Sequence, residues 1–577
     1  MGDKLSSKKY KGTLELNWIN KDKSLIYEYD EDGNPTKPQW VERDDIRVSE
    51  PRILTLKGEY CDPNNENMLI KGDNLLALRT LVEEFKNREE KDKVKCTYID
   101  PPYNTGNAFE DYEDNLEKSE WLTLMRDRLI LLKKLMSSSG VIIVQINHIN
   151  LGRLKCLLDE IFGPNNFVQI VTVETSDPSG HAIVNPGLYD ASEFILIYAR
   201  NKKLVDENKD IRVPIAHDFG YNKIILNIDD TYSNWIMDNV QNQVAKNLGF
   251  NSVKDVKKRL GKQGFNTEVA DFALKNAKRV FQSTAISDKA GKKIVELRDK
   301  SKEDDKVHYF KRENHYDVYI HKGREIYFYS KKVRKIDGKL TATKPLTNIW
   351  QDISWNGIAR EGGVKLKRGK KPEKLIKRIF QIYSVEGDLV LDSFLGSGTT
   401  AAVAHKIGRR WIGIEIGKHA ETHCLKRLKN VIDESNPDTT GISKDGDVDW
   451  KGGGGFRYYV LGDSLIKDHD INWGLEQEDI ARALFMNFDY GFNGSLGDGV
   501  FVGRRGHRYG LCLVSKNVKI VCAKRIGELI EQVNEKFDDL ADLEIYTNMG
   551  VGVRREDLPE NVTVKKIPES ILRKYKL

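Results

Sequence analysis

The stretch GDLVLDSFLGSGTTAAVAHKIGRRWIGIEIG (Gly387–Gly417) carries, in one continuous run, the pattern of a strand, a glycine-rich turn, a helix and a second strand. The apolar run GDLVLD predicts a buried strand that ends at Asp392, and SFLGSGTT predicts a turn of small residues. AAVAHKIG is typical of a helix, and RRWIGIEIG predicts a strand that ends at Glu415. Glycines let a backbone approach a ligand, and an acid about 20 residues further along accepts bonds from ribose hydroxyls. The stretch therefore predicts a nucleoside-cofactor site, without separating a dinucleotide from another adenosyl compound.

A second buried strand, VKCTYI (Val94–Ile99), is followed directly by DPPYNTGNAF (Asp100–Phe109). Proline ends strand pairing and fixes φ, so the backbone must turn here with little freedom. The carboxylate of Asp100 and the ring of Tyr103 are therefore expected to be held rigidly where the strand ends. The sequence predicts a stiff acidic corner at the edge of a sheet.

Strands and helices alternate around these two stretches. MLIKGDNLLALRTLVEEF predicts a strand, a turn and a helix, and EWLTLMRDRLILLKKLM (Glu120–Met136) predicts another helix. SSSGVIIVQI and SEFILIYA predict buried strands, while INLGRLKCLLDEIFG and EKLIKRIFQIYS predict helices. This alternation predicts an α/β fold with a Rossmann-like, doubly wound and mostly parallel sheet.

Composition limits the class of protein. A chain of 577 residues is expected to form two or three domains, since single cores stop growing at roughly 250–300 residues. No run approaches the roughly 20 apolar residues of a membrane span, and the start of the chain lacks a signal-peptide core. The six cysteines form no CxxC pair, which favours a cytoplasmic protein without a disulfide framework or a metal site. Because the net charge is only +6, a polyanionic partner must meet a local basic patch.

The regular pattern stops between about residues 202 and 345. Basic residues mixed with aromatic ones suit a nucleic-acid surface, because cations meet phosphates and rings stack on bases. A solvated insertion with a small core of its own is equally compatible with these residue types. The basic clusters are Lys257-Lys258-Arg259, Lys292-Lys293 and Lys331-Lys332-Val333-Arg334-Lys335, and the aromatic residues are Tyr309, Phe310, Tyr316, Tyr319, Tyr327, Phe328 and Tyr329.

The two stretches together resemble a known family. DPPY early in the chain and DSFLGSGTT late, with a variable basic region between them, resemble the permuted amino-methyltransferases that act on DNA. More closely, the chain is similar to the modification subunit of type III restriction–modification systems, which are β-class adenine-N6 methyltransferases. The similar blocks, in order between about residues 66 and 459, are NMLIKGDNLLAL, YIDPPYNTGNAF, WLTLMRDRL, DEIFGPNNF, KPEKL, LDSFLGSGTT, GRRWIGIEIG and WKGGGGFRYY, and VTVKKIPESIL lies in the tail.

This resemblance implies transfer of a methyl group from S-adenosyl-L-methionine to N6 of a flipped adenine in double-stranded DNA. It makes Asp100, Pro101, Pro102 and Tyr103 the catalytic residues. The carboxylate of Asp100 and the carbonyl of Pro101 accept the two N–H groups of the amine, and Tyr103 offers its ring to the extruded base. Aspartate at the head of the motif favours adenine N6 over cytosine N4.

The resemblance also implies the residues that bind the cofactor. The loop is formed by Asp392, Phe394, Gly396, Ser397, Gly398 and Thr399, while Glu415 holds the ribose. Asp73 is expected near the adenine of the cofactor, and Lys371-Pro372 opens the helix beside its methionine end. Two of these residues have plain structural alternatives, since Phe394 also suits a hydrophobic core and Asp73 suits a helix N-cap.

One strand end departs from the family pattern. Where such proteins usually have an acidic IDD-type ending, this chain has QINHIN (Gln145–Asn150), so the wall of the pocket beside the corner is expected to differ from the family pattern. His148 within it is expected to be a packing or surface residue, because the implied reaction needs no imidazole. The chemistry of the corner itself does not depend on this ending.

The resemblance divides the chain into five parts. These are an amino-terminal segment (1–60), the catalytic half of the core (61–201), a target-recognition insertion (202–345), the cofactor-binding half (346–438) and a small α/β carboxy-terminal domain (439–577) entered through Gly452–Gly455. The last part carries no catalytic constellation and is expected to contact a partner or a second subunit. A homodimer is expected, and a separate restriction subunit with helicase and nuclease activity is a possible partner.

Two other classes of function remain open on the sequence. A DNA-recognition subunit that has lost catalysis would bind S-adenosylmethionine without transferring its methyl group, although the intact DPPY and glycine loop argue against it. A nicotinamide-dependent oxidoreductase is suggested only by the strand–glycine–acid unit. Its loop usually contains a third glycine and lies early in the sheet, whereas GSGTT lies late.

Overall fold

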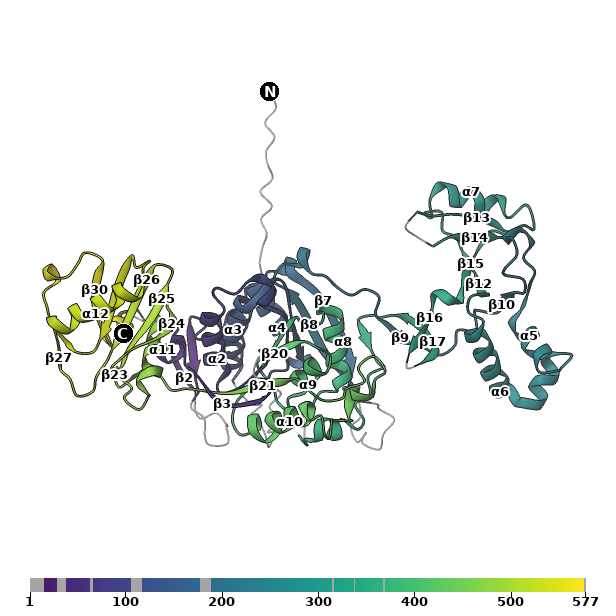
Figure 1. The fold of residues 1–577 in the computed structure, drawn as a ribbon. Coiled ribbons are helices and arrows are strands. Elements are labelled where there is room, and N and C mark those ends of the chain that lie inside the picture. Colours follow the sequence, from purple (N-terminus) through teal and green to yellow (C-terminus); the bar gives the residue numbers. More distant parts are fainter. Residues whose placement is uncertain are drawn as a thin grey trace, which may run out of the picture. The chain divides into compact units, whose positions relative to one another are not determined.

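The computed structural model describes residues 15–27, 38–62, 66–104, 117–176, 188–313, 316–336, 338–366 and 369–574. Two compact units are formed (Figure 1). The first, called the core unit here, contains residues 1–209, 348–444 and 448–577. The second, called the insertion unit, contains residues 210–347 together with 445–447. Within the described ranges, no helix combines the length and the apolar character needed to cross a bilayer.

The core unit is built on one ten-stranded sheet. Its strands, in spatial order, are β18 (Ile349–Trp350), β7 (Phe167–Glu174), β8 (Ser192–Ala199), β6 (Met136–Ile146), β5 (Val94–Ile99), β19 (Leu389–Asp392), β20 (Arg410–Glu415), β4 (Met68–Lys71), β21 (Gly455–Leu461) and β3 (Leu54–Cys61). Only β8 and β3 run antiparallel to their neighbours. The mostly parallel sheet predicted from the sequence is confirmed.

Helices cover both faces of this sheet (Figure 1). One layer consists of α2 (Asn74–Glu84), α3 (Lys118–Leu135) and α4 (His148–Phe162), and the other of α8 (Glu373–Tyr383), α9 (Thr399–Lys406) and α10 (Lys426–Ile432). Successive side chains of a strand point to opposite faces, so Leu389 and Leu391 join the core beneath α2 to α4, and Val390 points the other way. The doubly wound architecture predicted from the alternating pattern is therefore confirmed.

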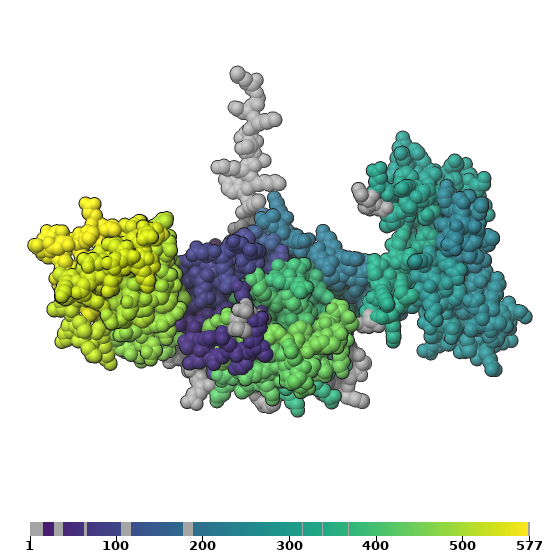
Figure 2. Space-filling view, in the orientation of Figure 1, coloured from purple at the N-terminus to yellow at the C-terminus, as the bar shows by residue number. Residues whose placement is uncertain are grey.

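Segments that are far apart in the chain meet at the centre of the sheet. β5 and β19 pair in parallel, with Val390 opposite Cys96 and Leu391 opposite Thr97. β19 pairs in the same direction with β20, and β20 with β4. In the space-filling view the purple early residues and the green later ones accordingly lie side by side (Figure 2). The four strands therefore end at one edge of the sheet.

The predicted end of the amino-terminal segment, at residue 60, and the predicted start of the carboxy-terminal domain, at residue 439, are wrong in detail. β3 lies almost entirely within the predicted amino-terminal segment, and β21 lies within the predicted carboxy-terminal domain, yet both belong to the core sheet. The reason is hydrogen bonding, because β4 would otherwise expose an unpaired edge. β21 pairs with β4 along this edge, and β3 pairs with the other side of β21. The start of β21 needs glycine, since a Cβ on Gly455 would collide with the backbone of Tyr60 and Asp62.

The rest of the carboxy-terminal part is the small α/β fold that the sequence predicts. A five-stranded sheet has the order β24-β25-β26-β28-β30, and its strands are β24 (Gly491–Gly497), β25 (Val500–Arg505), β26 (Arg508–Leu513), β28 (Asp542–Thr547) and β30 (Val562–Lys566). The helices are α11 (Gln477–Asn487), α12 (Ala523–Lys536) and α13 (Glu569–Lys574), while β27 (Ile520–Cys522) pairs with β29 (Gly550–Gly552).

The insertion unit has a hydrophobic core of its own, around Tyr221, Phe265 and Tyr329. A six-stranded sheet has the order β11 (Met237–Asn239), β10 (Lys223–Ile225), β12 (Val280–Ala285), β15 (Arg324–Phe328), β14 (Val318–His321) and β13 (His308–Phe310). A three-stranded sheet consists of β16 (Val333–Ile336), β17 (Lys339–Pro345) and β9 (Arg212–Pro214), and the helices are α5 (Val240–Asn247), α6 (Val253–Lys275) and α7 (Lys292–Lys300). Many of its aromatic residues therefore form a core.

Candidate active site and cofactor loop

The residues singled out in the sequence come together at one edge of the core sheet. Asp100 follows β5, Asp392 ends β19, Glu415 ends β20 and Asp73 follows β4. Because these four strands are parallel neighbours, their carboxyl ends share an edge, which is where open α/β sheets bind ligands. The predicted corner and the predicted cofactor loop therefore lie next to each other, although about 300 residues of chain separate them.

The corner is held by side chains on several sides. The carbonyl of Pro102 accepts a hydrogen bond from the indole of Trp121 at 2.8 Å, and the carbonyl of Tyr103 accepts one from the amide of Asn150 at 2.7 Å. Asp100 accepts a bond from the Tyr103 hydroxyl at 2.7 Å through Oδ1. Pro101 is buried. The prolines and these bonds together fix where the Asp100 carboxylate lies.

A buried lysine faces that carboxylate. Nζ of Lys371 lies 2.8 Å from Oδ2 of Asp100 and 3.6 Å from Oε2 of Glu193, and 5.1 Å from the centre of the Tyr103 ring. Burial raises the pKa of Asp100, and the ammonium group opposes that shift. Burial acts to lower the pKa of Lys371, but Asp100 and Glu193 outweigh it and raise that pKa above its usual value. The corner is thus a cluster of two carboxylates around one cation.

Glu193 is a site residue that the sequence did not reveal. It lies at the start of β8, and because β8 runs antiparallel to β6, its amino end reaches the same edge as the corner. Oε2 of Glu193 lies 2.7 Å from the Tyr103 hydroxyl oxygen and accepts a bond from the amide of Gln145. The unusual QINHIN ending therefore supplies an amide that binds this carboxylate. His148, in the same ending, is half-exposed at the start of α4.

The backbone of the glycine loop is fastened to the next strand. The amide of Leu395 donates to the carbonyl of Ile414 at 3.1 Å, and the amide of Gly396 donates to the carboxylate of Glu415. Asp392 accepts from the amide of Phe394 at 2.9 Å, and burial raises the pKa of Asp392 to about 7. The loop is therefore ordered by the strands that it connects.

The loop has room for a ligand at one glycine. Gly396 has φ +58°, and a Cβ built there would meet no atom within 4 Å, so its outer side faces open space. The buried carboxylate of Glu415 stands directly behind it. Phe394 is partly buried against the core cluster. An open glycine beside a buried acid fits an adenosyl cofactor, with Gly396 and Glu415 as the residues that would hold it.

Asp73 is a helix N-cap. Its Oδ1 accepts bonds from the amides of Leu75 at 2.7 Å and Leu76 at 3.3 Å, and Oδ2 lies 3.2 Å from Arg128. This is the structural alternative that the sequence left open. The amide of Asn74, next in the chain, donates to the carbonyl of Ser393 at 2.6 Å and so ties the start of α2 to the loop.

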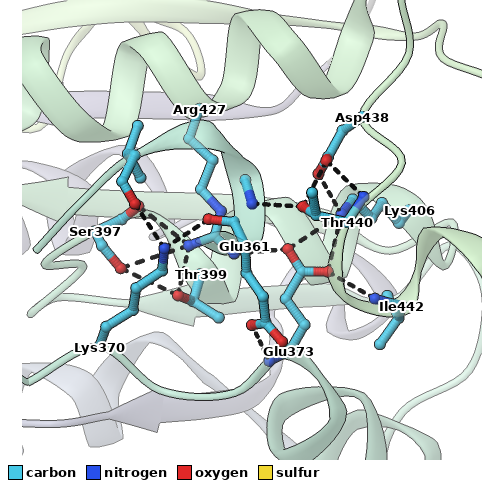
Figure 3. A network of polar contacts seen from close by, with 12 residues as sticks. Glu361, Lys370, Glu373, Ser397, Thr399, Lys406, Arg427, Asp438, Thr440 and Ile442 are labelled. Atoms are coloured by element: carbon cyan, nitrogen blue, oxygen red, sulfur yellow. Dashed lines mark hydrogen bonds and ion pairs between the residues drawn. The ribbon is translucent and has the colours of Figure 1, made fainter. Parts of the chain in front are cut away.

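A buried network of charges lies behind the loop (Figure 3). Arg427 donates to the hydroxyl of Thr399 at 2.7 Å and to Glu373 at 2.6 Å. Lys406 lies 2.8 Å from Glu373 and 2.7 Å from Asp438, so two cations balance two anions. The side chains of these four charged residues are at most 5% exposed. A buried network of this kind is sustainable only when every charge is paired.

Helix α8 connects this network to the corner. Pro372 is its N-cap, Lys371 lies before it and binds Asp100, and Glu373 begins it and binds Arg427. Burial acts to raise the pKa of Glu373, but Arg427 and Lys406 outweigh it and keep that pKa below its usual value. The placement of the loop and of the corner therefore depends on one helix start.

We expect different results when each of two loop glycines is replaced by alanine. Gly398 has φ +78°, and a Cβ there would lie 3.2 Å from Cα of Cys424. We expect Gly398→Ala to cost more than the roughly 1–2 kcal/mol of a left-handed residue. Gly396→Ala meets no neighbour, so we expect a smaller loss of stability but weaker binding of an adenosyl ligand. Denaturant unfolding and calorimetric titration separate the two effects, and equal stability losses would contradict the prediction.

The chain is similar in sequence to known proteins. A family model described as DNA methylase matches residues 94–426. The chain is similar to the probable type III restriction-modification enzyme HindVI Mod subunit of Haemophilus influenzae, with 36% identity over 69% of this chain and 54% of that protein. It is also similar to the type II methyltransferase M.EcaI of Enterobacter cloacae (28%; 63% and 69%) and to the type III EcoPI Mod subunit of Escherichia phage P1 (27%; 59% and 55%). The chain thus spans about half the length of the two Mod subunits.

Proposed function

The chain belongs to the DNA methylase family, and on that basis we propose that it transfers a methyl group from S-adenosylmethionine to N6 of a flipped adenine in duplex DNA. We propose further that it serves as the modification subunit of a type III restriction–modification system, as its Haemophilus and phage relatives are named. The observation that carries the proposal is the position of the Asp100 corner beside the Gly396 loop, on parallel neighbouring strands.

The corner would make an exocyclic amine a better nucleophile. The lone pair of such an amine is delocalised into the ring, so the nitrogen is a weak nucleophile. Asp100 and the carbonyl of Pro101 would accept its two N–H groups and turn the lone pair toward the methyl donor. Fixed placement of reacting groups and fixed charges each lower a barrier by several kcal/mol. A carboxylate does not deprotonate an arylamine beforehand, so the proton leaves after the nitrogen has gained its methyl group.

The remaining residues of the site would bind the cofactor and the extruded base. S-adenosylmethionine supplies, when bound, an electrophilic methyl group on a positively charged sulfur. Gly396 and Glu415 would hold its adenosyl part. The ring of Tyr103 offers a face on which an extruded base can stack, which offsets part of the cost of flipping.

The proposed partners follow from this role. Double-stranded DNA is the substrate, and we place its recognition in the insertion unit and the protein in the cytoplasm. We also propose a homodimer, with the carboxy-terminal α/β part contacting a second subunit or a restriction subunit.

The test is long-read sequencing of plasmid DNA from cells that make this chain alone. We expect N6-methyladenine in one short sequence motif. A mark on cytosine would overturn the choice of base, and unmodified DNA would overturn the proposed activity.

Two lysines of the insertion unit are expected to behave differently if DNA binds there. Nζ of Lys331 lies 3.5 Å from the ring centre of Tyr316 and 4.4 Å from that of Tyr327, and burial lowers its pKa. Lys335 is exposed. We expect Lys335→Ala to reduce the slope of log affinity against log salt by about one, whereas Lys331→Ala reduces thermal stability and leaves that slope unchanged. Salt-dependent binding and thermal unfolding of both variants test this, and a changed slope in Lys331→Ala would contradict it.

A further inference from the structure

Three oxygen atoms form a short chain at the edge of the core sheet. The hydroxyl oxygen of Tyr103 lies 2.7 Å from Oδ1 of Asp100 and 2.7 Å from Oε2 of Glu193. A phenol has one proton, so with both carboxylates ionised only one of these contacts is a hydrogen bond. Both become hydrogen bonds when one carboxyl gains a proton. The three groups are therefore arranged to take up a single proton.

Polar neighbours fix the position of the Glu193 carboxylate. Its carboxylate accepts from the amide of Gln145, whose own oxygen accepts from the hydroxyl of Tyr98 at 2.6 Å. An acid at the position of Gln145 would repel that carboxylate, whereas an amide binds it. The side chain of Glu193 is 20% exposed, so a proton that reaches it can pass to water.

We propose that Glu193 is the final acceptor of the proton that the methylated amine loses, and that Tyr103 passes this proton on from Asp100. The inference rests on the proposed methyl transfer. The methylated nitrogen carries a positive charge, and one N–H bond breaks with its electron pair staying on nitrogen. The proton binds Oδ1 of Asp100. The Tyr103 oxygen then takes it as the hydroxyl proton moves to Glu193, which releases a proton to water.

The groups around these three oxygens fit a transient proton on Asp100. Burial raises the pKa of Asp100, so it can hold a proton briefly, and Lys371 keeps the resting carboxylates from repelling each other. Burial also raises the pKa of Tyr103 well above its usual value, so the phenol stays neutral. Among the residues that the structure describes, Tyr98 and Asp392 are further titratable groups that interact with Asp100. Glu193 touches no reacting atom and acts through Tyr103.

The test compares Glu193→Gln, Glu193→Asp and the matched control Asp190→Asn, whose carboxylate is 79% exposed three positions earlier in the chain. Steady-state methylation of a duplex that contains the recognised motif is measured between pH 6 and 9. We expect Glu193→Gln to lower turnover by about 100-fold, with imidazole restoring part of it, because a dissolved base then accepts the proton. Glu193→Asp restores activity in part, and Asp190→Asn retains it. In each variant we expect the midpoint temperature of unfolding to stay unchanged and the affinity for S-adenosylmethionine to stay within twofold.

A second readout needs no turnover. The phenolic C–O infrared band of Tyr103 is assigned by its loss in Tyr103→Phe. On acidification we expect the band to shift in the unsubstituted protein and to shift less in Glu193→Gln, where Asp100 is the one carboxyl of the pair left to take a proton. Wild-type turnover in Glu193→Gln, or a loss that neither pH nor imidazole changes, would overturn this inference while leaving the proposed methylation intact. If the unsubstituted chain methylates no DNA, the proposed function fails and the proton route fails with it.

Discussion

Methylation is expected to fall by about 10³-fold when Asp100 is replaced by asparagine, while S-adenosylmethionine binding survives. The side-chain amide keeps the shape of the carboxylate but has one acceptor oxygen and no charge, so it cannot stabilise the positive charge that develops on the amine. Removing one such fixed group typically costs about 10²–10³ in rate, and the loss of charge adds to it. Incorporation of a labelled methyl group into duplex DNA measures the rate, and calorimetry measures cofactor binding.

The other end of the same strand provides the control. Asp92 lies just before β5 and pairs with Arg410 at 3.0 Å, and both side chains are partly exposed. Asp92→Asn removes the same charge from an ion pair, and pairs of this kind contribute at most about 1 kcal/mol. We expect it to methylate DNA normally. Normal methylation by Asp100→Asn would remove the corner from the mechanism.

The second large effect is expected at Arg427. Arg427→Met removes one of the two cations that form ion pairs with Glu373, and breaking a buried pair costs about 3–5 kcal/mol. We expect the free energy of unfolding to fall by this amount. The hydroxyl of Thr399 also loses its hydrogen bond from Arg427, so binding of S-adenosylmethionine is expected to weaken. Denaturant unfolding and calorimetry measure the two losses.

Two further variants show whether charge balance is the cause. In the double variant Arg427→Met with Glu373→Gln, Lys406 and Asp438 balance again, so we expect part of the stability to return. Arg378→Met is the matched control on helix α8. Arg378 pairs with Asp352, whose side chain is 35% exposed, so we expect a smaller loss than at the fully buried Arg427. A loss in Arg427→Met no larger than in this control would contradict the role of the network.

Much of the fold could be read from local patterns. The apolar run Val94–Ile99 forms β5, with the same bounds, and the strand ending at Asp392 forms β19. These predictions succeed because a strand buried on both faces must be apolar along its length, and small residues mark the turn that follows. The boundaries of the core failed at β3 and β21 because pairing along an edge leaves no mark in either segment alone.

The candidate site divides in the same way. DPPY and the glycine loop could be recognised because their chemistry needs particular residues at consecutive positions. The role of Asp73 as an N-cap was one of two readings, and only its bonds to Leu75 and Leu76 identified it. Glu193 and Arg427 gave no signal, since each acts on residues far from it in the chain.

The sequence by itself determined the alternating α/β pattern, the stiff acidic corner and the glycine loop, because these depend on neighbouring residues and on burial. Only the tertiary structure decided that β5 and β19 lie side by side, that Glu193 and Lys371 surround Asp100, and that Arg427 supports the loop. The physical reason is that charge pairing and strand pairing act through space. They join residues that no local pattern connects.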